Sequence, residues 1–402
     1  MRRVLAITVG GEPDPVVQAV RQHAPDFVIF FVTTEPAGGS RRFLLEDTEK
    51  GPSILKRTGL SGEAYEVIPL PNPDDFGDCF RRIHEALREH PAAGERLADY
   101  TGGTKTMTAA LATAALLLGW SLSVVVGARR DTVKVAKGTE LARRVGLAPV
   151  QQELVLLQVR ALYRSHEFAA AAALLQDLLG RAELPGREQE RLTRLCTFLR
   201  ALAAWDRFAY AEAQELLRAV GEVWPQGCAL LAQIWHQGTL DFGAVADLVG
   251  NAFRRAEQGR YEDAVLRLYR AVELLAQLRL RSAHGLSSED LDLTRLPADL
   301  AAPLAARREK EGRAWVGLVE AYGVLAALGD PLGRVYQAAW THRLKDLLGQ
   351  RNRLLLAHGL SPIGPADWER SRALALAFLS EAHAALGRPF QPVAFPRAEE
   401  VL

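Results

Sequence analysis

The first part of the chain alternates short apolar runs with segments that are apolar at helical spacing. The apolar runs are rich in β-branched and aromatic residues and predict strands over Val4–Val9, Phe27–Thr33, Tyr65–Leu70, Leu97–Tyr100 and Ser121–Val126. Between these runs, helical spacing predicts helices over Pro15–His23, Phe76–Glu89 and Met107–Leu118. Alternating strands and helices are typical of a mostly parallel sheet with helices on both faces, so we expect an α/β domain over residues 1–147.

The strand signal disappears after about residue 150, and an all-helical region is predicted over residues 148–244. Apolar positions recur at helical spacing over Leu154–Leu179, Glu188–Trp205 and Ala211–Val220. Three segments, around Phe168, Phe208 and Tyr261, are similar to the helical hairpins of tetratricopeptide proteins. Because these segments are irregularly spaced, we expect ordinary hairpin packing and not a repeat array.

A further helical domain is predicted over residues 245–402. Breaks are expected at Gly285–Ser288, Pro297–Pro303, Gly329–Gly333 and Gly359–Pro365. The candidate helices between them are Asn251–Ala283, Arg307–Leu328, Leu332–Leu348 and Ala366–Ala385. No element is predicted for Pro389–Leu402, which has little periodicity.

Composition narrows the classes of protein. The 49 basic and 48 acidic residues give a net charge of +1, which excludes a globally basic nucleic-acid coat. The histidines form neither HxxxH nor HExxH, and Cys79, Cys196 and Cys228 are isolated, so we expect no metal site and no disulfide scaffold. The N-terminal apolar run is too short for a signal peptide, and the longest apolar stretch, Ala109–Trp120, is too short to span a membrane. We therefore expect a cytoplasmic protein.

The first motif whose residues suit binding or catalysis follows the predicted strand that ends at Tyr100. It is the turn Thr101-Gly102-Gly103-Thr104-Lys105, which leads into a helix. Glycines allow close approach of a ligand, the helix N-terminus favours an anion, and threonine and lysine add donors. The turn lacks both glycines of a Walker A loop, which argues against an NTPase. A phosphate-bearing ligand is therefore the favoured interpretation, and a tight turn with a capped helix is the alternative.

A basic segment lies between Gly127 and Arg144 and carries six Lys/Arg against Asp131 and Glu140. It could line an anionic-ligand site or an inter-subunit surface. A solvated hairpin is the favoured interpretation.

The second motif lies near the end of the chain. In Gln350–Gly359, Arg351 and His358 are seven residues apart, about 700° on a helix, so they share one face to within about 20°. Arg353 and His358 point about 140° apart on a regular helix. Arginine binds phosphate and histidine transfers protons, so such a pair can cleave RNA at its 2′-hydroxyl without a metal. From chemistry alone, a solvated arginine cluster with a histidine at a helix end remains the favoured alternative.

These motifs carry a resemblance to known families. The Thr101–Lys105 turn in a Rossmann-like domain resembles the CARF domains of CRISPR-associated proteins, which implies cyclic oligoadenylate binding at a dimer interface. The turn Gly10-Gly11-Glu12 and the pair Thr33-Thr34 match other strand ends that face the ligand. The resemblance thus implies ten ligand-binding residues: Gly10, Gly11, Glu12, Thr33, Thr34, Thr101, Gly102, Gly103, Thr104 and Lys105.

The C-terminal motif is similar to that of the HEPN ribonucleases. Arg351-Asn352 with His358 fits the longest spacing of that family, and Arg353 with His358 fits the shortest. The combination resembles the CARF–HEPN accessory ribonucleases of type III CRISPR systems. It implies a homodimeric, metal-independent endoribonuclease that cleaves single-stranded RNA, needs no cofactor, and takes cyclic oligoadenylate as its allosteric activator.

Two alternatives remain open from the sequence. One is a nucleotide-sensing regulator without catalysis, and the other is a sensor domain that degrades its own cyclic ligand.

Overall fold

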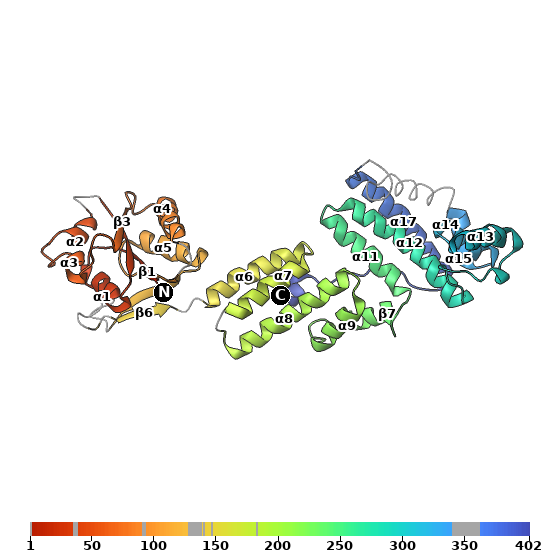
Figure 1. The fold of residues 1–402 in the computed structure, drawn as a ribbon, viewed down its shortest axis with the longest axis horizontal. Helices are drawn as coiled ribbons and strands as arrows, with labels where there is room; N and C mark the ends of the chain where they lie inside the picture. Colours follow the sequence, from red (N-terminus) through yellow and green to blue (C-terminus); the bar gives the residue numbers. More distant parts are fainter. Residues whose placement is uncertain are drawn as a thin grey trace. The chain divides into compact units, whose positions relative to one another are not determined.

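The computed structural model describes residues 2–34, 39–90, 94–127, 139, 141–145, 148–181, 184–339 and 362–402. The chain forms two compact units, Met1–Glu153 and Leu154–Leu402, which we call the N-terminal unit and the helical unit (Figure 1). The domain boundaries expected at 147/148 and 244/245 stay predictions.

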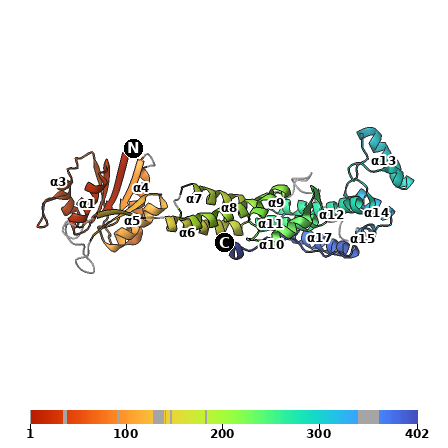
Figure 2. The same ribbon diagram turned by 90° about the horizontal axis from the view of Figure 1, so that it is seen from below.

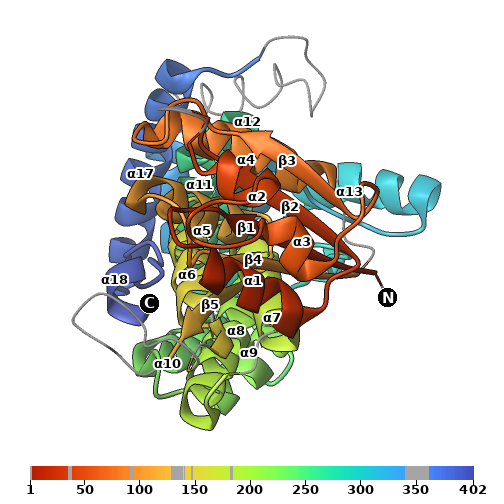
Figure 3. The ribbon, with the colours of Figure 1, turned by 90° about the vertical axis from the view of Figure 1, so that its left-hand side faces the viewer.

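The N-terminal unit is built on a sheet in the order β3-β2-β1-β4-β5-β6 (Figure 3). Five strands are parallel: β1 (Arg2–Thr8), β2 (Phe27–Val32), β3 (Tyr65–Pro69), β4 (Gly94–Asp99) and β5 (Ser121–Val126). This confirms the predicted mostly parallel sheet. The sequence did not predict β6 (Leu141–Val145), which pairs antiparallel with β5 and carries two arginines in five residues.

Helices cover both faces of the sheet because its buried strands are apolar on both sides. On one face, Leu5 and Ile7 of β1 pack in a core with α1 (Pro13–His23), α2 (Arg41–Leu45) and α3 (Ile54–Thr58). On the other face, Val4 and Ala6 pack with α4 (Phe76–Glu89) and α5 (Lys105–Leu117). Alternate side chains of β1 point to opposite faces of the sheet. They pack against α1, which follows β1, on one face and against α5, which follows β4, on the other.

The helical unit begins with hairpins joined by the same short turn. The helices are α6 (Ala148–Arg164), α7 (Phe168–Arg181), α8 (Gly186–Asp206), α9 (Tyr210–Ala219) and α10 (Pro225–Ile234), followed by the short hairpin β7 (Trp235–His236) and β8 (Thr239–Leu240). The middle residues of three turns, His166, Phe208 and Gly259, have φ values of 59°, 65° and 73°. This shared left-handed turn is what the three similar sequence segments have in common.

The same turns correct two predicted helices. The expected helix Leu154–Leu179 is divided between α6 and α7. The expected helix Asn251–Ala283 is divided into α11 (Gly243–Glu257) and α12 (Tyr261–His284). Helical spacing continues across both turns because the buried faces of the two helices in each hairpin contribute to one core.

The C-terminal bundle contains α11, α12, α14 (Leu318–Ala327), α15 (Pro331–Ala339) and α17 (Pro365–Ala385), with Tyr322, Tyr336 and Phe378 in mutual ring contact. The expected helix Ala366–Ala385 is confirmed. The expected break at Pro297–Pro303 is wrong, since α13 (Ala298–Glu311) follows the 3-10 turn η1 (Leu293–Arg295) and includes Pro303. Only Leu304 of α13 is buried, and this helix lies outside the bundle (Figure 2).

The segment after α17, which we call the tail, makes long-range contacts that the sequence does not predict. It returns to the first hairpins and ends in α18 (Ala398–Val401). Phe395 makes ring contacts with Phe168, Trp205 and Trp224 at centroid distances of 5.3–6.0 Å. Tyr163 donates a hydrogen bond to the carbonyl oxygen of Pro396 at 2.7 Å. The tail therefore ties the bundle to the preceding hairpins.

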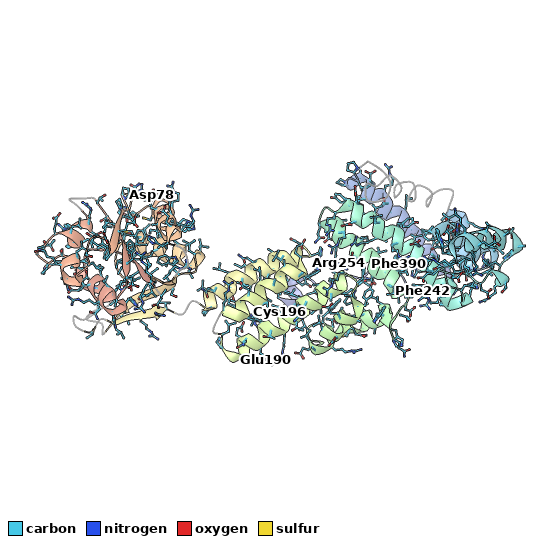
Figure 4. The ribbon with its side chains drawn as sticks, in the orientation of Figure 1. Asp78, Glu190, Cys196, Phe242, Arg254 and Phe390 are labelled. Atoms are coloured by element: carbon cyan, nitrogen blue, oxygen red, sulfur yellow. The ribbon has the colours of Figure 1, made fainter. Side chains whose placement is uncertain are left out.

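A buried polar network joins α8 and α11 beside that tail. Asp247 of α11 accepts hydrogen bonds from Trp205 Nε1 at 3.0 Å and from the Tyr210 hydroxyl at 2.8 Å. Arg254 of α11, labelled in Figure 4, donates from Nε to Asp206 Oδ1 at 2.8 Å. Its guanidinium carbon lies 3.9 Å from the centre of the Phe395 ring. Burial lowers the pKa of Arg254 to about 10, and the neighbouring Asp247 carboxylate opposes that shift.

Candidate functional site

The carboxyl ends of β1, β2 and β4 meet at a cavity of about 450 Å³ in the N-terminal unit. Such strand ends are where open α/β sheets bind ligands. The cavity is lined by residues from the three strand ends and from the segment after β2: Val9, Gly10, Gly11, Thr33, Gly39, Ser40, Arg42, Phe43, Gly103, Thr104 and Met107.

The structure brings half of the expected ligand residues together at this cavity. The lining includes Gly10, Gly11, Thr33, Gly103 and Thr104. It does not include Glu12, Thr34, Thr101, Gly102 and Lys105. Glu12 pairs instead with Lys50, whose Nζ lies 3.1 Å from Glu12 Oε1. The assignment of all ten residues to a ligand stays a prediction.

The glycines at this edge allow two turns of the protein to pack closely. A Cβ on Gly10 would lie 2.6 Å from the backbone nitrogen of Gly103. A Cβ on Gly102 would lie 2.5 Å from the carbonyl oxygen of Thr8. Gly103 has a φ of +98°, which favours glycine. By contrast, a Cβ on Gly11 would meet nothing within 4 Å, so Gly11 is the glycine that borders open space.

Three of the four threonines among the expected ligand residues have hydrogen-bond partners within the protein. The Thr104 hydroxyl caps α5 by accepting from the Met107 N–H at 3.2 Å, and it donates to the carbonyl oxygen of Pro73 at 2.7 Å. The Thr101 hydroxyl accepts from the Val125 N–H at 2.7 Å. The Thr33 hydroxyl accepts from the Ser40 N–H at 2.8 Å. These hydroxyls therefore shape the edge, which agrees with the alternative interpretation of a capped helix.

Two further groups complete the electrostatics of the edge. Lys105 is the first residue of α5 and is exposed, outside the cavity lining. Asp99 lies fully buried at the end of β4, and its Oδ1 accepts from the Thr101 N–H at 3.1 Å. Burial raises the pKa of Asp99, and its Oδ2 has no hydrogen-bond partner among the described residues. Near Asp99, the Nε2 atom of His23 lies 2.8 Å from the Ser123 hydroxyl.

Sequence reasoning missed the contribution of the segment after β2. Ser40, Arg42 and Phe43 line the cavity from the start of α2. The available signal was the run Arg41-Arg42-Phe43, two cations followed by an aromatic residue. That run lies in a stretch without helical periodicity, so the sequence predicts neither an element nor a binding residue there.

Two family models match the helical unit. A family model described as the Csm6 6H domain matches residues 152–237, and one described as the Csm6 HEPN domain matches residues 241–381. Together they match more than half of the chain. The chain belongs to the Csm6 family of CRISPR-associated CARF–HEPN proteins.

A solved Csm6 structure shares the fold over most of the chain. Enterococcus italicus Csm6 bound to cyclic hexa-2′-fluoro-hexa-dAMP is 13% identical, covers 96% of this chain and 95% of its own, and has a TM-score of 0.61. Can2 from Sulfobacillus thermosulfidooxidans in complex with cyclic tetra-adenylate is 17% identical over 56% of this chain and 69% of its own, with a TM-score of 0.25. A search of curated proteins finds no match.

The Csm6 HEPN match includes the arginine–histidine motif. Arg351, Asn352, Arg353 and His358 lie outside the described residues, between α15, which ends at Ala339, and α17, which begins at Pro365. Most of the basic segment Gly127–Arg144 also lies outside them. The roles expected for these residues stay predictions.

Among the residues that the structure describes, no group of three or more His, Cys, Asp or Glu side chains is arranged to hold a metal ion. In the same ranges, no helix combines the length and the apolar character needed to cross a membrane.

Proposed function

We propose that this Csm6-family protein is a metal-independent endoribonuclease, activated by cyclic oligoadenylate, that cleaves single-stranded RNA in type III CRISPR defence. The observation that carries the proposal is the Csm6 HEPN match over residues 241–381, a range that contains Arg351 and His358. A guanidinium and an imidazole in one motif supply the two functions that RNA cleavage needs, binding of the phosphate and transfer of a proton.

In the proposed reaction the RNA supplies its own nucleophile. The 2′-oxygen attacks the adjacent phosphorus and loses its proton, and the bond from phosphorus to the 5′-oxygen breaks. The products are a 2′,3′-cyclic phosphate and a 5′-hydroxyl, which takes up a proton. Arg351 neutralises the scissile phosphate, His358 transfers a proton, and Asn352 orients the site. Arg353 takes the role of Arg351 if the shorter spacing is the working one.

The proposed site is composite. The resemblance to HEPN ribonucleases implies that Arg351 and His358 of two protomers face each other, so the working protein is a homodimer. The activator would bind at the strand-end cavity of the N-terminal unit. That cavity is lined by the Arg42 side chain, which suits a phosphate, and it lies beside the start of α5. The fold-level similarity to a Csm6 structure bound to a cyclic oligonucleotide supports this choice.

The test is cleavage of labelled single-stranded RNA by the full chain in EDTA, with and without cyclic tetra-adenylate or cyclic hexa-adenylate. We expect cleavage that depends on one of the two activators. His358→Ala should lower the rate about 10²- to 10⁴-fold, the usual contribution of a general acid or base. Exposed His236 offers the control, since His236→Ala should leave the rate unchanged. Activity that is lost in EDTA and restored by a divalent ion would contradict metal independence.

Variants of Arg351 and Arg353 show which of the two arginines acts together with His358. Arg351→Ala should match the loss at His358, and Arg353→Ala should be milder if the helix is regular through the motif. A larger loss at Arg353 would assign the shorter spacing. If no RNA is cleaved while the activator binds, the protein is a non-catalytic sensor. If the activator itself is consumed, the N-terminal unit degrades its ligand.

A further inference from the structure

The strand-end cavity holds one charged residue among its described lining residues, and that residue is Arg42. The lysine that the sequence favoured, Lys105, lies outside the lining. Lys50 lies nearby, but its ammonium donates to the carbonyl oxygen of Gly11 at 2.6 Å and pairs with Glu12. An anionic ligand in this cavity therefore meets the Arg42 guanidinium before either lysine.

The position of Arg42 is set by the end of β2. Ser40 Oγ accepts from the Thr33 N–H at 2.9 Å, and the Ser40 N–H donates to Thr33 Oγ1 at 2.8 Å. The Arg41 N–H adds a bond to the Thr33 carbonyl oxygen at 3.1 Å. Gly39 has a φ of +53°, and a Cβ there would lie 2.4 Å from that same oxygen. These hydrogen bonds attach the start of α2 to the edge of the sheet.

The side chain of Arg42 is exposed and oriented by an aromatic ring. Its guanidinium carbon lies 4.7 Å from the centre of the Phe43 ring, and Phe43 is 6% exposed. A ring that is itself fixed in the core restricts the guanidinium plane while its N–H groups remain available. Among the described residues, no carboxylate forms an ion pair or hydrogen bond with Arg42. Arg41, its neighbour, is equally exposed but does not line the cavity.

We propose that Arg42 binds a phosphodiester of the activator, so that the segment after β2, and not the start of α5, supplies the charge of the ligand site. This inference rests on the proposed function, because it assumes a cyclic oligoadenylate ligand. A guanidinium can bind two phosphate oxygens at once, which an ammonium cannot do with the same geometry. The adjacent Arg41 provides a charge-matched comparison within the same turn of chain.

The experiment is fluorescence polarisation with labelled cyclic tetra-adenylate and cyclic hexa-adenylate on the full chain. A hydrogen-bonded charge contact is worth roughly 1.5–3 kcal/mol, so Arg42→Ala should raise the Kd about 10- to 150-fold. Arg42→Lys should give an intermediate loss of affinity, and Arg41→Ala should stay within about twofold because Arg41 does not line the cavity and its exposed charge is screened. In RNA cleavage, Arg42→Ala should raise the activator concentration needed for half-maximal rate and leave the maximal rate unchanged.

The outcomes separate this inference from the proposed function. If the wild-type chain binds an activator and Arg42→Ala binds it equally well, the assignment of Arg42 is wrong and the proposed function stands. If Arg41→Ala loses as much affinity for the activator as Arg42→Ala does, the arginines act by general electrostatic attraction. The assignment of Arg42 is then also wrong. If the wild-type chain binds neither compound, the proposed activator is wrong and the assignment of Arg42 falls with it. Thermal unfolding of each variant shows whether the N-terminal unit remains folded.

Discussion

Two arginine pairs look alike in the sequence and have opposite environments in the structure. Arg41 and Arg42 are both exposed and Arg42 lines the strand-end cavity, whereas Arg254 and Arg255 in α11 are 4% and 8% exposed. Both members of the buried pair contact the carboxylate of Asp206. A buried charge that lacks a partner is costly because it loses its hydration, so the buried pair is held by carboxylates. The exposed pair has water available, and Arg42 can therefore remain open to a ligand.

The difference separates two uses of arginine. At the junction of α8 and α11, the charges fix the geometry between two helical segments that match separate family models. At the sheet edge, the charge borders a cavity. The same contrast appears among the polar groups of the edge itself, where Thr101 and Asp99 lie inward and Lys105 faces solvent.

The largest effect is expected at Arg254. Arg254→Ala leaves the buried Asp247 carboxylate without its cation, leaves Asp206 with Arg255 as its remaining partner, and removes the contact with the Phe395 ring. Removing one partner of a buried ion pair costs about 3–5 kcal/mol of unfolding free energy. Urea unfolding followed by tryptophan fluorescence reports this directly, because Trp205 and Trp224 lie in the same core. Arg42→Ala is the control and should change stability by less than about 0.5 kcal/mol. Equal stability of the two variants would remove the contrast.

A smaller effect is expected at Thr101. Thr101→Val keeps the shape of the side chain but leaves the Val125 N–H without its acceptor. An unsatisfied buried donor costs about 1–3 kcal/mol. Thermal unfolding of the N-terminal unit should show the loss, while Thr113→Val, which removes a hydroxyl bonded within α5, should cost less. If Thr101→Val instead kept full stability and lost activator binding, its hydroxyl would belong to the ligand site and not to the sheet edge.

The third experiment uses pH. Burial raises the pKa of Asp99 above its ordinary value, so the folded unit binds this proton more tightly than the unfolded chain does. Its contribution to stability is therefore present at acid pH and is lost as pH rises through the folded pKa. Asp99→Asn should remove that loss of stability, so the unfolding free energy of the variant should rise relative to that of the wild type as the pH increases above the ordinary pKa of an aspartate. The difference between the two proteins is the relevant quantity, because burial lowers the pKa of the neighbouring His23 and this group titrates as well.

The smallest effect is expected at Lys105. Its ammonium is exposed and does not line the cavity, so its attraction for a ligand phosphate is screened by solvent and is worth up to about 1 kcal/mol. Lys105→Ala should therefore raise the activator Kd only about two- to fivefold. A loss above tenfold in the polarisation assay would place the principal charge at α5 and would refute the comparison with Arg42.

Much of the fold was predictable because it depends on local patterns. Apolar runs over Phe27–Thr33 and Ser121–Val126 became β2 and β5, and the helical spacing of Phe76–Glu89 became α4 without a change of bounds. The strand β6 was missed because its exposed arginines hide the pattern. The tail after residue 389 was missed because its order comes from Phe395 contacting residues far away in the sequence.

The candidate site divides in the same way. The sequence by itself determined which strand ends would meet, since parallel strands joined by helices place their carboxyl ends at one edge. It also determined the glycine–threonine turn before α5. Only the tertiary structure decided that the threonine hydroxyls are satisfied by Pro73, Val125 and Ser40 and that Arg42 lines the cavity. The physical reason is that hydrogen bonding and desolvation depend on which distant segments surround a side chain, and two arginine pairs with the same letters acquire different surroundings only when the chain folds.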